Sequence, residues 1–277
     1  MRQFRVLPAS LTAPIFEPGT VWLVGAGPGD PGLLTLHAAN ALAQADVVVH
    51  DALASADILA LTPHARLEAA GKRAGGRRTP QLRINERLIQ LARQGLRVVR
   101  LKGGDPLIFG RGAEEALALA AAGIPFRIIP GISAGIGGTA AAGIPLTHRR
   151  LARSVSFATG HDSSGELADI DWAALGRGAD VLVLYMAQRQ IAGIARRLIA
   201  AGRDGAEAVA LISDATLASQ QVRITTLAQA ADAAVPAGAP TLIVVGPVVA
   251  LRPLFAGWQQ IAPMTLASRP EPARAQG

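Results

Sequence analysis

Ten short runs rich in valine, isoleucine and leucine recur along the chain, and segments with a helical pattern separate most of them. Runs of this length and composition are typical of buried strands. The predicted strands cover residues 21–26, 46–50, 66–70, 96–101, 126–129, 154–159, 180–185, 207–212, 221–225 and 240–246. The predicted helices cover residues 33–44, 56–61, 80–94, 113–122, 188–201 and 226–234. This alternation predicts an α/β fold in which helices cover both faces of parallel or mixed sheets.

The length of 277 residues suits one large domain or two ordinary ones. A segment rich in proline and glycine, residues 130–147, separates the first five predicted strands from the last five. We therefore expect an N-terminal extension (1–19), an N-terminal α/β domain (20–130), an inter-domain segment (131–149), a C-terminal α/β domain (150–262) and a disordered tail (263–277).

The composition excludes several kinds of chemistry. There is no cysteine, which removes disulfides, thiolate metal sites and thiol catalysis, and which fits a reducing, cytoplasmic location. The uncharged stretch 128–147 is long enough to cross a membrane, but its two prolines and five glycines would break such a helix, so we expect no membrane segment. His148 and His161 have no partner at metal-ligand spacing, so no metal is expected.

Positive charge is concentrated in one part of the chain. The net charge is +7, and residues 72–111 hold eleven basic and two acidic side chains. This cluster favours a polyanionic ligand, either nucleic acid or a small polycarboxylate, although a solvated basic face is the ordinary alternative. An aromatic content of 4% is too low for the stacking platforms of single-strand binders. Only two lysines occur, Lys72 and Lys102, which hints at a need for a compact ammonium at these positions.

A glycine-rich run, KGGDPLIFGRG at residues 102–112, follows one predicted strand and precedes a helix. Loops at strand ends commonly build the ligand site of an α/β fold. Gly103 and Gly104 let the backbone approach a ligand closely, and Asp105 supplies a fixed acceptor. Lys102 and Arg111 place positive charge at the two ends of the run. The alternative is a tight strand-to-helix turn.

A second glycine loop, VGAGPGDPG at residues 24–32, is similar to the dinucleotide fingerprint G-x-G-x-x-G. Asp30 stands where the third glycine belongs, and Pro28 removes a backbone N–H that a pyrophosphate would need. The loop therefore predicts either a ligand without phosphates or only a rigid turn.

Other strand ends carry weaker signals. Asp51 could bind a ribose, accept a proton or cap a helix. Small residues at 130–134 and 142–149 permit packing against a flat ligand, or an ordinary helix–sheet contact. Met186 suits an adenine or another apolar ring, and equally suits a core.

Taken together, these motifs resemble the uroporphyrinogen-III C-methyltransferases of the tetrapyrrole methylase superfamily, from about Val21 to Gly246. The matching blocks are VGAGPGDPGLLTL, VVVHD, GKRAG, PQLRIN, RLKGGDPLIFGRGAEE, PGISA, AGIPLTHR, TGHD, LYMA and APTLIVVG. The resemblance implies a homodimer of two αβα domains with the active site in the cleft between them. It implies S-adenosylmethionine as methyl donor and S-adenosylhomocysteine as product. The implied reaction is methylation of uroporphyrinogen III at C2 and C7, through precorrin-1 to precorrin-2.

The resemblance also implies roles for matching residues. The cofactor site would be lined by Pro28, Gly103, Gly104, Asp105, Ile108, Ser133, Ala134, Met186, Ala215 and Thr241. The catalytic residues would be Asp51 as proton acceptor, Lys72 as proton donor and Arg111 in an electrostatic role. The substrate would lie against Arg111, Glu114, Arg149 and Met186.

The chain departs from the family pattern at Ala52, Arg83, Ser133 and Ala215, where arginine, an acid, threonine and glycine are commoner. These departures bear on ligand contacts and not on the reaction class. Two other functions stay open at this point. One is a methyltransferase of the same fold acting on another corrinoid precursor or on RNA; the basic pI suggests RNA, and the KGGDPLIFGRG run argues against RNA. The other is a non-catalytic nucleotide-binding module, which Pro28 and Asp30 disfavour. We expect no nucleic-acid partner.

Overall fold

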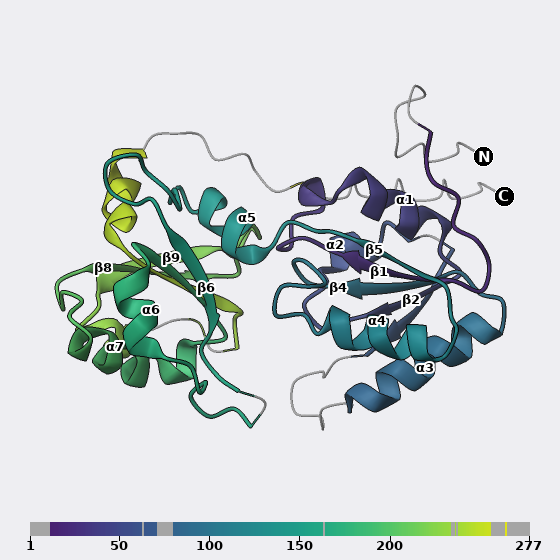
Figure 1. Cartoon of the computed structure of the whole chain (residues 1–277). Coiled ribbons are helices and arrows are strands. Elements are labelled where there is room, and N and C mark those ends of the chain that lie inside the picture. The colour runs from purple at the N-terminus through teal and green to yellow at the C-terminus, as the bar shows by residue number, and fades with distance from the viewer. Residues whose placement is uncertain are drawn as a thin grey trace, which may run out of the picture.

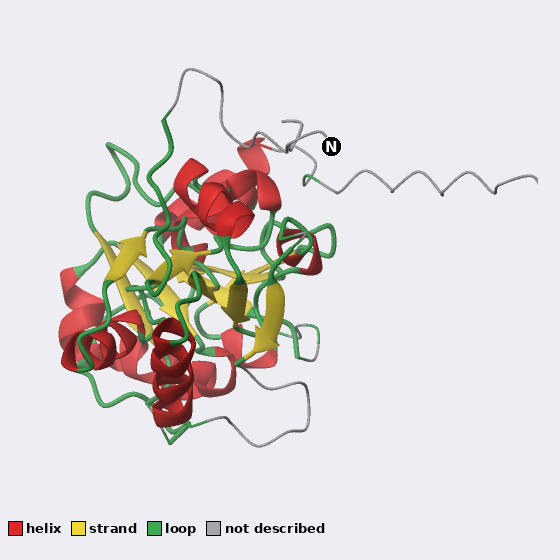
Figure 2. Cartoon of the chain, turned by 90° about the vertical axis from the view of Figure 1, so that its right-hand side faces the viewer, coloured by secondary structure: helices red, strands yellow, loops and turns green. Residues whose placement is uncertain are grey.

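The computed structural model describes residues 12–62, 64–70, 80–162, 164–233, 236, 238–255 and 264. Two α/β units lie side by side, each built on one five-stranded sheet, and the short helix α5 (Ala134–Ala141) lies between them (Figure 1). In the view at right angles, helices flank the strands (Figure 2). The predicted α/β class with parallel and mixed sheets is confirmed.

The first sheet is parallel throughout and has the order β3-β2-β4-β1-β5. Its strands are β1 (Val21–Gly25), β2 (Val47–His50), β3 (Arg66–Ala69), β4 (Val98–Lys102) and β5 (Phe126–Ile129). From β1 the chain crosses toward β2, and from β4 it crosses back toward β5. The loops after the adjacent strands β1 and β4 therefore leave the sheet in opposite directions. The space between two such loops is the usual position of a ligand site in these sheets.

Helices bury both faces of this sheet. The helices are α1 (Leu36–Gln44), α2 (Ala56–Leu59), α3 (Gln81–Arg93) and α4 (Gly112–Ala121). One face packs Trp22 and Val48 against α1, and the other packs Val98 against Leu88 and Leu119 of α3 and α4. With both faces covered, the strands read as continuous apolar runs and not as alternating ones.

The second sheet is mixed and has the order β6-β7-β10-β8-β9. Its strands are β6 (Val155–Thr159), β7 (Val181–Tyr185), β8 (Ala208–Ser213), β9 (Gln221–Thr226) and β10 (Thr241–Val245). Only the β6–β7 pair is parallel. Because β10 is antiparallel to β7 and β8, the start of β10 lies beside the ends of both. Helices α6 (Trp172–Gly178) and α7 (Ile191–Ala200) cover one face.

All ten predicted strands are present, but the prediction of helices was less complete. Helix α5 lies inside the segment that was expected only to connect the domains, and α6 was not predicted. The helix predicted over 226–234 is wrong, because β9 runs to Thr226 and only a 3₁₀ turn, Ala230–Asp232, follows it.

Part of the expected N-terminal extension packs against the first sheet. Phe16, in the expected N-terminal extension, is buried and stacks on Trp22 with ring centroids 4.3 Å apart. Apart from Met264, the predicted tail lies outside the described residues. The exact domain boundaries stay a prediction. None of the described helices is both long and apolar enough to cross a membrane.

Candidate active site

The two glycine loops predicted from the sequence are hydrogen-bonded to each other at the carboxyl edge of the parallel sheet. The Gly27 N–H donates to the Gly104 carbonyl at 3.1 Å, and the Gly104 N–H donates to the Gly27 carbonyl at 2.7 Å. Both glycines have left-handed backbone, with φ of +71° and +66°, a conformation that glycine adopts at little cost. The loop holding Pro28 and the loop holding Asp105 are thus one structural unit.

The loop after β5 joins this unit through Asp105. One carboxylate oxygen of Asp105 accepts the Leu107 N–H at 2.8 Å, and the other accepts the Gly131 N–H at 3.1 Å. A Cβ on Gly131 would collide with the Gly104 carbonyl oxygen, so only glycine permits this approach. Asp105 is half-buried, and each of its oxygens can accept a further hydrogen bond from a ligand.

The second sheet presents its own predicted residues at one edge. Met186 follows the end of β7, Ala215 follows the end of β8, and Thr241 begins β10. The Thr241 hydroxyl lies 2.9 Å from that of Ser213. Because β10 is antiparallel to its neighbours, these three positions from distant parts of the sequence come together.

Polar contacts join the two edges. The Asp30 N–H donates to the Thr216 hydroxyl at 3.1 Å. The Ser133 and Tyr185 hydroxyls are 2.6 Å apart. A Cβ added to Gly138 of α5 would lie 2.8 Å from the Ala215 side chain, so α5 packs tightly on the second sheet. The structure therefore brings the predicted cofactor residues from both halves of the chain into one region.

Strained backbone gathers in the same region. Five described residues other than glycine have positive φ: Phe109, Arg111, Met186, Asp214 and Thr216. Each belongs to, or flanks, a predicted site position. Such conformations cost on the order of 1–3 kcal/mol each and cluster at functional sites. The clustering supports a functional role for these loops on evidence independent of the sequence motifs.

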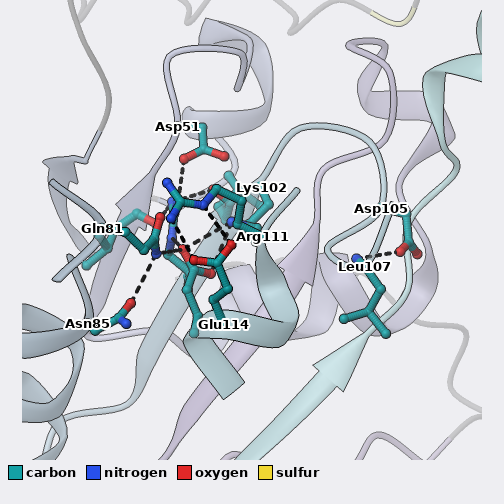
Figure 3. Close-up of polar contacts among 12 residues, drawn as sticks. Asp51, Gln81, Asn85, Lys102, Asp105, Leu107, Arg111 and Glu114 are labelled. Carbon is teal, nitrogen blue, oxygen red and sulfur yellow. Dashed lines mark hydrogen bonds and ion pairs between the residues drawn. The ribbon is translucent and has the colours of Figure 1, made fainter. Parts of the chain in front are cut away.

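A buried network of charges lies beneath this edge (Figure 3). It joins Asp51, Arg100, Lys102 and Glu115. Arg100 pairs with Asp51 and also donates to Glu115 at 3.0 Å, while Lys102 lies 3.0 Å from the second Glu115 oxygen. Arg100 and Lys102 are each 2% exposed, and Glu115 is 0% exposed. Gln81 of α3 donates to Glu115 at 3.0 Å. Two positive and two negative groups thus balance, and three of them are buried while the Asp51 side chain is 29% exposed.

The burial of this network changes the proton affinities of its cations. Burial and the neighbouring Arg100 guanidinium lower the pKa of the Lys102 ammonium below its usual value, and Glu115 opposes them. Burial also acts to lower the pKa of Arg100, but the carboxylates of Asp51 and Glu115 outweigh it, and the pKa of Arg100 is raised.

These contacts revise two expectations. Lys102 does not present its charge to the glycine loop, because it follows Arg100 by two residues in β4 and faces α4 with it. Asp51 does not cap α2, whose cap is Ser55, and its side chain is held by Arg100. Lys72, the predicted proton donor, lies outside the described residues.

The predicted substrate residues are only partly assembled. Arg111 forms an exposed pair with Glu114, with nitrogen and oxygen 2.6 Å apart. The hydrogen bond from Arg111 lowers the pKa of the Glu114 carboxyl. Exposed apolar side chains lie on the loops after β2, β4 and β7: Leu53, Leu107, Ile108, Phe109 and Met186. Arg149 is exposed in the turn after α5, and among the described residues its side chain makes no hydrogen bond or ion pair with another predicted site residue.

The basic cluster is less basic in three dimensions than along the sequence. Of the seven basic side chains described between residues 80 and 111, six form ion pairs, most of them with carboxylates from outside that interval. The charge free to attract an anion is correspondingly smaller.

Sequence reasoning missed Arg100, Glu115 and Tyr185. A signal was present for the first two. Arg100 stands between apolar residues in the middle of β4, and Glu115 lies on the inward face of α4. A charge buried in this way needs an opposite charge beside it.

The residues present fit a sulfonium ligand better than a phosphate ligand. Asp105 supplies negative charge, Ile108 and Met186 supply apolar surface, and Pro28 and Asp30 disfavour phosphate. Within the described ranges, no group of three or more histidine, aspartate or glutamate side chains could hold a metal.

The paired sheets and interlocked glycine loops define a class that comparison with known proteins identifies. A family model described as Tetrapyrrole (Corrin/Porphyrin) Methylases matches residues 20–231, and the chain belongs to this family. Over 244 residues it is 57% identical to a uroporphyrinogen-III C-methyltransferase from Sinorhizobium sp, an alignment that covers 86% of this chain and 87% of that protein. It is 50% identical to siroheme synthase 1 from Yersinia pseudotuberculosis, over 87% of this chain and 51% of that protein, so it spans about half the length of that relative.

Solved structures agree with the sequence relatives. The uroporphyrin-III C-methyl transferase from Thermus thermophilus, complexed with S-adenyl homocysteine, matches with a TM-score of 0.74 and 37% identity, over 84% of this chain and 99% of the other. A cobalt precorrin-4 methyltransferase, CbiF, matches with a TM-score of 0.73 and 26% identity, over 83% of this chain and 96% of the other.

Proposed function

We propose that this chain is an S-adenosylmethionine-dependent methyltransferase that converts uroporphyrinogen III to precorrin-2 by methylating C2 and C7. The observation that carries the proposal is the 57% identity to a named uroporphyrinogen-III C-methyltransferase over most of both chains. The interlocked loops of Gly27 and Gly104 support it, because they lie at the edge where this fold binds ligands. Other corrinoid methylases share the fold at lower identity.

We propose that S-adenosylmethionine binds between the glycine loops and the facing edge of the second sheet. Pro28, Gly103, Gly104, Asp105 and Ile108 would contact it from the first sheet, Ser133 and Ala134 from the start of α5, and Met186, Ala215 and Thr241 from the second sheet. When bound, the sulfonium supplies an electrophilic methyl group. Asp105 is the charged residue in this set, and its carboxylate would face the positively charged sulfonium.

The chain's main contribution to the reaction is positioning. Holding an electron-rich pyrrole carbon in line with the methyl group can supply about 7–11 kcal/mol of the barrier. The substrate must also lose a proton, and a positioned base contributes roughly 10²–10⁴-fold. Asp51 is our choice of base, with its carboxylate oriented by Arg100. Arg111, Glu114, Arg149 and Met186 would hold the tetrapyrrole, and Lys72 would donate a proton. Guanidinium groups pair readily with the carboxylates of such a substrate.

We further propose a cytoplasmic homodimer. The absence of cysteine fits a reducing compartment, and the dimer is implied by family resemblance. Sedimentation at two protein concentrations tests the dimer directly.

Replacing Arg111 by alanine is expected to lower kcat by about 10²–10³-fold, the typical cost of losing one preorganised electrostatic group. Cofactor affinity should stay near that of the wild type, because Arg111 is proposed to face the tetrapyrrole. The measurement is turnover together with S-adenosylhomocysteine titration by calorimetry. Arg66→Ala is the matched control, since it also removes an exposed arginine paired with a glutamate, but at the start of β3 and so away from the carboxyl edge of the sheet. Loss of cofactor binding in Arg111→Ala would move this residue to the other site.

The function is tested by incubating the protein with uroporphyrinogen III and S-adenosylmethionine carrying a labelled methyl group. We expect two labels in each product molecule. After oxidation of the product, we expect the absorption spectrum of oxidised precorrin-2. Label transfer to a later corrinoid precursor but not to uroporphyrinogen III would support the alternative substrate. Label transfer to RNA, with binding that weakens steeply as salt rises, would support an RNA methyltransferase.

A further inference from the structure

Tyr185, the only tyrosine in the chain, bridges the two halves of the candidate site. It ends β7, and its side chain reaches the start of α5. The phenol oxygen accepts the Gly135 N–H at 2.7 Å and lies 2.6 Å from the Ser133 hydroxyl. These two bonds fix the turn that holds Ser133 and Ala134.

The ring of Tyr185 has contacts of its own. Phe109, from the loop after β4, lies against it with ring centroids 4.8 Å apart, and Phe157 of β6 meets it edge-on at 6.1 Å. Phe109 holds a left-handed backbone conformation two residues before Arg111. One side chain therefore contacts both the start of α5 and the loop that carries Arg111.

The surrounding chain is shaped to accept this phenol. A Cβ on Gly135 would collide with the phenol oxygen, so glycine is required at that position. Ser133 is 7% exposed, and its hydroxyl has no other hydrogen-bond partner among the described residues. Burial raises the pKa of the Tyr185 phenol above its usual value, with the Asp105 carboxylate acting in the same direction. The phenol is therefore neutral at pH 7 and can both donate and accept.

We propose that Tyr185 is a positioning residue that couples the donor site to the acceptor site. Its hydroxyl sets the Ser133–Ala134 turn against the methyl donor, and its ring sets the Phe109–Arg111 segment against the tetrapyrrole. The inference rests on the proposed function, because it assigns the two ligands to these two segments. It adds a residue that contacts neither ligand in that scheme and yet affects the placement of both.

A spectroscopic test uses the fact that the chain has a single tyrosine. Protein grown with tyrosine enriched in ¹³C at Cζ carries one labelled phenol carbon, at residue 185. Adding S-adenosylhomocysteine should shift this resonance, and adding uroporphyrin III, the oxidised form of the proposed substrate, should shift it again. Saturation with S-adenosylhomocysteine, verified by calorimetry on the same sample, without any change in the resonance would overturn the proposal.

A mutational test separates the hydroxyl from the ring. Tyr185→Phe is expected to weaken S-adenosylhomocysteine binding about 10-fold, because the Gly135 N–H and the Ser133 hydroxyl lose their partner. The ring is kept, so kcat at saturating donor should stay within about 3-fold of the wild type, a change of less than 1 kcal/mol. Tyr185→Leu also removes the contact with Phe109, and it should lower kcat by a further order of magnitude.

Phe157→Leu is the control, because it alters packing on the same ring without touching the hydroxyl. Unchanged donor affinity in Tyr185→Phe, measured beside a wild type that binds and methylates, overturns the coupling role alone. An equal loss of donor affinity in Phe157→Leu also overturns the coupling role, because the loss in Tyr185→Phe would then reflect altered packing and not the missing hydroxyl. A wild type that binds no S-adenosylhomocysteine overturns the proposed function itself, so the two failures are distinguishable. A Tyr185→Phe protein that does not fold leaves the labelled wild type as the deciding experiment.

Discussion

Replacing Glu115 by glutamine is expected to lower the free energy of unfolding by about 3–5 kcal/mol, the usual cost of removing one partner from a buried ion pair. Glutamine has the same shape, so no cavity forms. The loss arises because Arg100 and Lys102 would then share one remaining carboxylate, that of Asp51. Urea unfolding followed by circular dichroism measures the change.

The preceding residue of α4 is the natural control. Glu114 carries the same charge and also pairs with an arginine, but its side chain is 53% exposed. Glu114→Gln should change stability by no more than about 1 kcal/mol, because water solvates the arginine that is left unpaired. Equal effects of the two substitutions would show that the buried network contributes nothing specific to stability.

The deficit of Glu115→Gln should also depend on pH. In the folded protein the pKa of Lys102 is lowered from 10.5, so folding disfavours its charged form. When the pKa of a lysine is lower in the folded than in the unfolded protein, the free energy of unfolding rises with pH. The rise ends when the pH passes the pKa of that lysine in the unfolded chain. We therefore expect the deficit to shrink as the pH is raised from neutrality toward 10. Adding Lys102→Met to Glu115→Gln should remove this dependence, because the uncompensated cation is then absent.

Replacing Asp105 by alanine is expected to reduce S-adenosylmethionine affinity by at least about 100-fold. Two bonds from the backbone to the carboxylate are lost, and bonds to a charged group contribute about 1.5–3 kcal/mol each. Those bonds tie Leu107 and Gly131 to the same side chain, so the loop after β4 and the loop after β5 would separate. The charge facing the sulfonium would be lost as well. Calorimetric titration measures the affinity.

Asp204→Ala is the matched control for Asp105→Ala. Asp204 accepts the backbone N–H two residues ahead at 2.8 Å, the same contact that Asp105 makes with Leu107. It precedes β8, so it lies at the edge of the second sheet away from Met186 and Thr241. Normal affinity is expected in this variant. Normal affinity in Asp105→Ala itself would refute the assignment of Asp105 to the cofactor site.

The strands could be predicted from sequence because burial on both faces leaves a simple signal. Runs such as Val47-Val48-Val49 have no polar alternation, and only a covered sheet accepts them. The glycine loops were also predictable, because two glycines and an aspartate directly follow a buried strand, where α/β folds commonly build a ligand site. Their pairing with Gly27 follows once β1 and β4 are known to be neighbours.

Helix α5 could not be predicted, because its sequence, AGIGGTAA, has neither the apolar period nor the propensity of an isolated helix. Tertiary packing stabilises it. Gly135 and Gly138 allow Tyr185 and Ala215 to approach its backbone, and those partners are more than 45 residues away in sequence. A sequence pattern read over a few neighbouring residues does not report contacts between residues so far apart in the chain.

The pairing of charges within the network could not be predicted for a related reason. Counting charges along residues 72–111 suggests a basic surface, but the fold supplies Asp46, Asp51, Glu68, Glu114 and Glu115 to neutralise it. Which carboxylate meets which cation depends on the order of strands, and that order places β2 beside β4. Asp51 and Arg100 are joined by that adjacency.

The enclosure of Lys102 has a practical consequence for labelling. The chain contains two lysines, and the fold encloses one of them beside Glu115, with 2% of its side chain exposed. Amine-directed reagents applied to the native protein are therefore left with Lys72 as the remaining lysine. Such a reagent is expected to spare Lys102 in the folded protein, so modification of Lys102 would report on opening of the buried network.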